Sequence, residues 1–236
     1  MTPSTMTLRE EGVYDRRLGT DDERPFSIFV PQKFEERYAY PLVVFLHGHG
    51  EDERQWLSQI MHLSRRNYVG LALRGPHRVV GKSGRHGFGW GRDRRSDSAL
   101  EDYALAAVEE VRSSLNIDPR NIHLAGFGEG ASLALQLGLS LHGSFSKIVA
   151  INARMSSSPM HLAFGPQRLR GLNRPRVLLG VGPEFTGDDG EKTKHAHRLL
   201  DAAGLSVELR SYSSGDRLTH AMLRDADRWL TGWWAR

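Results

Sequence analysis

The pattern of apolar and polar residues switches repeatedly between a two-residue period and a 3.6-residue period along the chain. Residues 25–30 alternate as in an outer strand, whereas residues 42–46 are apolar throughout, which is typical of a strand covered on both faces. The same reasoning predicts further buried strands over residues 69–73, 122–125, 148–151, 177–181 and 207–212. Apolar stripes with helical spacing lie between them, over residues 57–64, 99–115, 131–141, 192–203 and 221–234.

Strands that alternate with helices predict an α/β fold, in which a doubly wound and mostly parallel sheet carries helices on both faces. A chain of 236 residues without a long linker is expected to form a single domain over residues 1–236. Residues 1–20 and the glycine- and arginine-rich stretch 81–95 are the segments expected to be flexible. In such sheets the ligand site lies on the loops that leave the carboxyl ends of the strands.

The glycine-rich turn GFGEG, residues 126–130, follows one of these strands and fits two templates. It has the spacing of the G-x-S-x-G nucleophile elbow, with Gly128 where the serine would stand. Gly126, Gly128 and Ala131 also fit the dinucleotide-binding pattern G-x-G-x-x-G/A. A dinucleotide turn normally follows the first strand of its unit, and an acidic residue ends the next strand. Here the turn follows several strands, and Arg154, which would suit a 2′-phosphate, is the only feature nearby that favours a nucleotide.

Composition narrows the function classes. The chain has no cysteine, which excludes disulfides, thiolate metal sites and a cysteine nucleophile. His195 and His197 are two residues apart on a predicted helix and do not share a face, so no metal site is expected there, and no cofactor is expected elsewhere. No stretch is long and apolar enough to predict a signal peptide or a membrane span, so a cytoplasmic protein is expected.

The net charge is +4 and the sequence pI is about 9.6, but most basic residues are scattered among acidic ones, so nucleic-acid binding is not expected. One segment differs, because residues 74–95 carry seven positive charges against Asp93 alone. The positive residues are Arg74, Arg78, Lys82, Arg85, Arg92, Arg94 and Arg95. This arginine segment is either a solvated loop or a surface that holds an anionic ligand.

Six stretches occur in an order that resembles the carboxylesterase/phospholipase family of α/β-hydrolases, which includes the acyl-protein thioesterases. They are PLVVFLHGHGED (41–52), LALRGP (71–76), GFGW (87–90), NIDPRNIHLAGFGEGASLAL (116–135), PRVLLGVG (175–182) and the tail over residues 220–230. The resemblance implies the α/β-hydrolase fold and a carboxylic-ester hydrolase that acts on small acyl esters. It favours the nucleophile-elbow template over the dinucleotide template.

The resemblance also assigns a role to each site residue. The family's serine would stand at Gly128, which offers no nucleophile, and its histidine corresponds to His220. The family's aspartate falls at Phe185, so the neighbouring Glu184 is the candidate acid, and a doubtful one. The oxyanion hole would use the backbone N–H groups of His49 and Glu129, for which side-chain identity matters little.

Two functions follow from this interpretation. The first is a non-catalytic homologue, a pseudoenzyme, that binds an acyl ester or an anionic ligand in the former active-site cleft. The second is a carboxylesterase, phospholipase or thioesterase that is inactivated at the nucleophile, or that retains weak hydrolysis in which His220 activates water. Anion or nucleotide binding by the arginine segment is a third, less favoured function. Ser132, one helical turn beyond Gly128, is expected to pack within the helix and not to replace the nucleophile.

Overall fold

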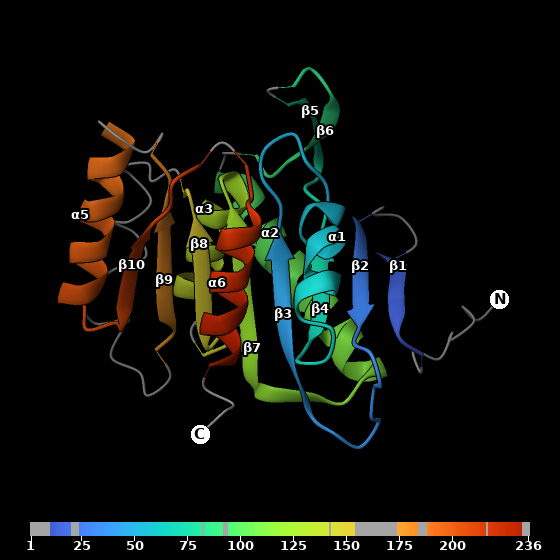
Figure 1. The fold of residues 1–236 in the computed structure, drawn as a ribbon. Coiled ribbons are helices and arrows are strands. Elements are labelled where there is room, and N and C mark those ends of the chain that lie inside the picture. The colour runs from blue at the N-terminus through green and yellow to red at the C-terminus, as the bar shows by residue number, and fades with distance from the viewer. Residues whose placement is uncertain are drawn as a thin grey trace.

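A single sheet of eight strands organises the described part of the chain (Figure 1). The computed structural model describes residues 10–19, 24–81, 83–91, 94–141, 143–153, 174–183, 188–215 and 217–232. The strands lie in the order β1-β2-β4-β3-β7-β8-β9-β10. Their bounds are β1 Gly12–Leu18, β2 Arg24–Val30, β3 Tyr40–Leu46, β4 Val69–Leu73, β7 Ile117–Phe127, β8 Lys147–Ile151, β9 Arg176–Val181 and β10 Val207–Ser211. Only the pairs β1–β2 and β2–β4 are antiparallel, which confirms the mostly parallel sheet.

Helices cover both faces of the sheet, as the alternation of strands and helices predicted. α1 (Arg54–Leu63) and α6 (His220–Thr231) lie on one face, and α2 (Arg94–Ser114), α3 (Glu129–Ser140) and α5 (Asp188–Ala202) lie on the other (Figure 1). Strand β3 is buried along its whole length, because Leu42, Val44 and Leu46 pack under one helical layer while Val43 and Phe45 pack under the other. This two-sided burial explains why the strand is apolar at every position.

The structure contains three strands that the sequence analysis did not predict. β1 lies within residues 1–20, which were expected to be flexible, and it pairs with β2 along seven residues. Tyr14 and Leu18 of β1 pack against the core, while the three residues between them, Asp15, Arg16 and Arg17, are charged. Because of these charges the segment has no apolar run from which a strand could be predicted. β7 is also longer than the predicted 122–125.

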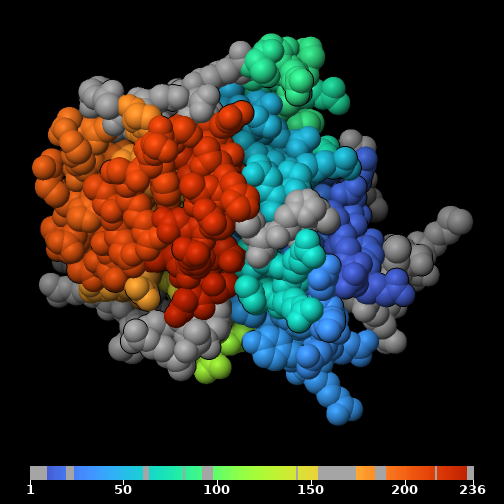
Figure 2. All heavy atoms as spheres, viewed as in Figure 1, coloured from blue at the N-terminus to red at the C-terminus, as the bar shows by residue number. Residues whose placement is uncertain are grey.

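The other two strands form the hairpin β5 (His77–Val80) and β6 (His86–Gly89), and β6 lies within the stretch 81–95 that was expected to be flexible. The hairpin projects beyond the carboxyl ends of the parallel strands (Figures 1 and 2). It is held to the loop after β3, because Gly50 donates to the carbonyl of Phe88 at 2.9 Å and Phe88 donates to the carbonyl of Glu51 at 2.8 Å. A Cβ at Gly87 would lie 2.0 Å from the carbonyl oxygen of Gly50, so this close approach requires glycine. Tertiary pairing therefore orders a stretch that has no apolar pattern of its own.

None of the described helices is long and apolar enough to cross a membrane.

Candidate active site at a glycine elbow

A sharp turn joins β7 to α3 at the carboxyl edge of the sheet. β7 ends at Phe127, α3 begins at Glu129, and Gly128 between them has φ 57° and ψ −116°. The N–H of Gly128 donates to the carbonyl of Ile151 at 2.9 Å, which ties the turn to β8. A strained strand-to-helix turn of this kind presents its central residue above the sheet, which is the geometry of a nucleophile elbow. Here the central residue carries no side chain.

The three glycines of the elbow differ in how much space a side chain would have. A Cβ at Gly126 would lie 2.2 Å from the carbonyl oxygen of Gly130, and a Cβ at Gly130 would lie 2.3 Å from the carbonyl oxygen of Leu46. Both flanking positions therefore require glycine. At Gly128 the nearest heavy atom of the described residues to a Cβ, apart from its chain neighbours, would be the Cα of Gly48, at 3.9 Å, so these residues leave room for a side chain at the central position. Only its positive φ favours glycine there.

His47 braces the loop that follows β3. Its buried Nε2 accepts the N–H of Gly75 at 2.9 Å, so Nδ1 carries the proton and donates to the carbonyl of Gly48 at 2.8 Å. Burial lowers the pKa of His47, which keeps the ring neutral as this pattern requires. The indole of Trp90 donates to the carbonyl of His47 at 2.8 Å, and Gln55 accepts the N–H of Gly48 at 2.8 Å. The sequence analysis gave His47 no role, although its place directly after a buried strand was the available signal.

His49 and Glu129 lie side by side at the elbow. Within the described residues, neither backbone N–H has a hydrogen-bond acceptor. This is the state expected of oxyanion-hole donors before a ligand binds. The two side chains also meet, because Nδ1 of His49 lies 3.0 Å from Oε2 of Glu129. The sequence analysis considered only the backbone of these residues and did not predict the contact.

Asn152 connects the loops that follow β8, β9 and β10. Its side chain is buried, its φ is 55°, and its Oδ1 accepts the N–H of Gly182 at 2.8 Å. Its Nδ2 donates to the carbonyl of Gly215 at 2.5 Å. In the hydrolase family that the sequence resembles, the loops after β9 and β10 carry the acid and the histidine. Asn152 therefore fixes the position of one of these two loops relative to the other.

His220 is the first residue of α6 and is exposed at the same edge of the sheet as the elbow (Figure 1). Thr219 caps the helix by accepting the N–H of Met222 at 3.3 Å. Glu184, the candidate acid, and Phe185 lie outside the described residues. The structure thus brings together Gly128, His49 and Glu129, and it places His220 at the same edge without a hydrogen-bond partner in the described part of the chain.

The hydroxyl of Ser132 donates to the carbonyl of Gly128 at 3.3 Å, one turn back along α3. This is the back-bonding common for serine within a helix, and it matches the packing role expected of Ser132.

The arginine segment is only partly available to a ligand. The guanidinium of Arg74 pairs with the buried carboxylate of Glu53, with an Nε to Oε2 distance of 2.6 Å, and lies over the ring of Phe88. The hydrogen bond that Arg74 donates to the Glu53 carboxylate raises the pKa of Arg74, so this residue belongs to the scaffold. Arg78 and Arg85 are exposed on the hairpin. Lys82 and Arg92, and the side chains of Arg94 and Arg95, lie outside what the structure describes.

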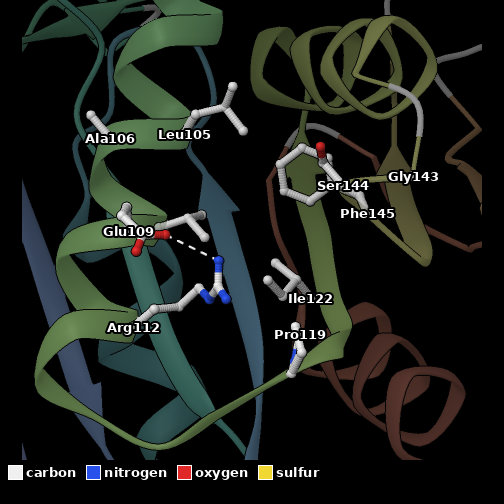
Figure 3. Close-up of a pocket in the computed structure, with 10 residues that line it drawn as sticks. Leu105, Ala106, Glu109, Arg112, Pro119, Ile122, Gly143, Ser144 and Phe145 are labelled. Atoms are coloured by element: carbon white, nitrogen blue, oxygen red, sulfur yellow. Dashed lines mark hydrogen bonds and ion pairs between the residues drawn. The ribbon is translucent and has the colours of Figure 1, made fainter.

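Two of the hollows that described residues line lie away from the elbow. A hollow of about 520 Å³ lies between α2, the amino end of β7 and residues 143–145, where Glu109 and Arg112 form an ion pair (Figure 3). A second, of about 390 Å³, lies beside β1 and β2 and includes Glu53 and Arg74. Gly128, His49 and Glu129 line neither hollow. The elbow is reached from solvent, since the His49 side chain is 53% exposed.

Comparison with known proteins agrees with this geometry. The model of the phospholipase/carboxylesterase family matches residues 33–231. Among solved structures the chain is similar to a carboxylesterase from Mesorhizobium loti, at 20% identity and a TM-score of 0.71 over 92% of this chain and 99% of the other. A carboxylesterase from Bacillus cereus is similar at 16% identity and a TM-score of 0.66, over 89% and 94%.

The fluorophosphonate-binding serine hydrolase FphF of Staphylococcus aureus is similar at 12% identity and a TM-score of 0.70, over 96% of this chain and 99% of the other. No curated protein matches the chain. At these identities the solved structures establish the fold, while the family model covers most of the sequence. The chain therefore belongs to the phospholipase/carboxylesterase family of α/β-hydrolases.

Proposed function

We propose that this chain binds a carboxylic ester, or the carboxylate derived from it, at the glycine elbow and does not form an acyl-enzyme. The observation that carries the proposal is the apex of the elbow, where Gly128 adopts the turn of the family's nucleophile without a side chain. Covalent acyl transfer needs an oxygen or sulfur atom at this point to attack the carbonyl carbon. The chain is a non-catalytic homologue with respect to that reaction.

The neighbouring hydroxyl does not replace the missing nucleophile. Ser132 is half-buried within α3, and its oxygen is directed to the carbonyl of Gly128. A carbonyl group bound at the oxyanion hole would lie above the N-terminus of α3, whereas Ser132 lies one turn into the helix. An esterase that is inactivated at the nucleophile would also form no covalent intermediate. That alternative differs because it predicts that Gly128→Ser restores the intermediate.

Two features support binding of a carbonyl or carboxylate oxygen. The N–H groups of His49 and Glu129 have no acceptor within the described residues, and donors of this kind stabilise negative charge on an oxygen. Glu129 also opens the 12-residue helix α3, whose N-terminus carries the positive end of the helix dipole. His47 and Gln55 hold the loop rigidly, so the donors are positioned before a ligand arrives.

An NMR titration tests the proposal. Ethyl butyrate and butyrate are added to the ¹⁵N-labelled chain, and butanol serves as the control ligand that lacks a carbonyl. We expect saturable shifts of the backbone amides of His49 and Glu129 with the ester and the carboxylate, and none with butanol. The amide of Gly143, beyond the other end of α3, is the internal control. Shifts that are absent at His49 and Glu129, or equal for all three compounds, would overturn the proposal.

A further inference from the structure

The side chains of the two oxyanion-hole residues form a histidine–carboxylate pair. Nδ1 of His49 lies 3.0 Å from Oε2 of Glu129, although 80 positions separate the residues in sequence. An ionised carboxylate only accepts hydrogen bonds, so Nδ1 must carry the proton. In the neutral ring the lone pair is then on Nε2. Within the described residues Nε2 has no partner, and the His49 side chain is 53% exposed, so water reaches it.

Backbone contacts fix the position of this pair beside the elbow. His49 follows Gly48, Glu129 follows Gly128, and the Cα of Gly48 would lie 3.9 Å from a Cβ at position 128. Below the pair, a Cβ at Gly89 would meet the Glu129 carboxylate at 3.2 Å and Nδ1 of His49 at 3.3 Å. The glycine at position 89 therefore leaves the space that the pair occupies. The hairpin strand β6 thus contributes to the site.

The empty apex provides room for a small nucleophile. Among the described residues, the one heavy atom within 4 Å of a Cβ at Gly128 and outside its chain neighbours would be the Cα of Gly48. A serine hydroxymethyl group would occupy this position in an active relative, and because Gly128 is partly exposed, water reaches the position here. Glu129 follows the apex directly in the chain, and Gly48, which precedes His49, approaches the apex in space.

We propose that His49 is the general base of a slow ester hydrolysis in which water replaces the serine, and that Glu129 positions its ring. This inference rests on the proposed binding of an ester at the elbow. The water oxygen bonds to the carbonyl carbon, its proton passes to Nε2 of His49, and the carbonyl oxygen becomes an oxyanion held by the N–H groups of His49 and Glu129. The bond from carbon to the leaving oxygen then breaks, and His49 returns the proton to that oxygen. One ester and one water give one carboxylic acid and one alcohol.

His220 is the competing base, because it corresponds to the family's histidine. Within the described residues it has no carboxylate partner, whereas His49 has one at 3.0 Å. A carboxylate that orients the ring and stabilises the imidazolium raises the efficiency of a histidine base by orders of magnitude. Glu184, the candidate acid for His220, lies outside the described residues, so it is the His49–Glu129 contact that favours His49.

The experiment measures hydrolysis of p-nitrophenyl acetate by the parent and by four variants, His49→Gln, Glu129→Gln, His220→Ala and His195→Gln. His49→Gln removes the base but keeps the backbone N–H, and Glu129→Gln keeps a hydrogen-bond acceptor but removes the charge. We expect steady hydrolysis above buffer by the parent without an initial burst, since no acyl-enzyme accumulates. His49→Gln should lower the enzymatic rate by about 100-fold or to background, and Glu129→Gln by about 10-fold or more. His195→Gln, an exposed histidine on α5, is the matched control and should behave as the parent.

Three outcomes would overturn the inference. They are a parent rate equal to buffer, full activity of His49→Gln, and loss of activity in His220→Ala while His49→Gln stays active. The NMR titration separates this failure from failure of the proposed function. If the amides of His49 and Glu129 shift but no hydrolysis is detected, the proposed ester binding stands. Only the proposed catalysis by His49 and Glu129 is then wrong. Circular dichroism melts of each variant establish that a lost rate does not reflect unfolding.

Discussion

The Oδ1 atom of Asn152 accepts a hydrogen bond of 2.8 Å from the N–H of Gly182, in a place where both residues are buried. Through its Nδ2, the same side chain holds the carbonyl of Gly215. The loops after β9 and β10 also approach closely by themselves, since a Cβ at Gly182 would lie 2.3 Å from the Cα of Gly215. One amide side chain therefore satisfies two buried backbone groups at the edge of the sheet that carries the elbow.

Asn152→Ala is predicted to destabilise the fold by about 2 to 4 kcal/mol, because each buried backbone group left without a partner costs ~1–3 kcal/mol. Urea denaturation measures the change in the free energy of unfolding. Asn116→Ala is the matched control, since Asn116 is exposed and donates to the carbonyl of Arg37 at 3.2 Å. If Asn152→Ala cost no more than the control, Asn152 would not hold these loops.

Alanine substitutions of the elbow glycines should differ in cost. Gly130→Ala is predicted to lose about 3 kcal/mol or more, because its Cβ would overlap the carbonyl oxygen of Leu46. Gly128→Ala should lose only about 1–3 kcal/mol, since the cost is limited to backbone strain at φ 57°. Gly84→Ala provides the strain-only reference, with φ 75° and no atom within 4 Å of its Cβ. Equal melting temperatures for Gly130→Ala and Gly84→Ala would contradict the steric explanation.

The free energy of unfolding should decrease as the pH is lowered, because buried His123 resists protonation in the folded protein. Burial, aided by the charge on Lys147, lowers the pKa of His123 from 6.5 to about 3. The unfolded chain therefore binds a proton at this residue below about pH 6.5 that the folded chain does not bind. The contribution is complete above pH 6.5 and is lost as the pH falls from there towards 3, at about 1.4 kcal/mol per pH unit.

Urea unfolding at pH 6.5 and pH 5.0 checks this direction. The parent should lose about 2 kcal/mol more than His123→Gln between the two values. Exposed His195→Gln should lose as much as the parent. An equal pH dependence of the parent and His123→Gln would show that the ring does not stay neutral in the folded protein.

The central strands of the fold are predictable because each is buried on both faces and therefore apolar along nearly its whole length, as β3 and residues 148–151 of β8 show. β1 and the β5–β6 hairpin are not predictable in this way, since their order comes from pairing with β2 and with Glu51. A sequence pattern reports the local period, and it does not report which distant backbone will supply hydrogen bonds.

The elbow itself was predictable for a steric reason. Gly126 and Gly130 stand where no side chain fits, so their spacing carries the geometry of the turn. The pair His49–Glu129 and the bridge from Asn152 to Gly215 were not predictable, because each joins segments that meet only after the sheet forms. From the sequence, Asn152 received no role, and His49 was considered only as a backbone donor.

Labelling with a fluorophosphonate probe tests most directly whether Gly128 removes the covalent reaction, and intact-mass spectrometry gives the stoichiometry. The parent is predicted to take up no probe, because no hydroxyl stands at the apex of the elbow. Gly128→Ser supplies the hydroxyl in a position with room for it, and labelling of that variant at the substituted residue would show that a base still reaches the apex. Stoichiometric labelling of any residue in the parent would contradict the absence of a nucleophile.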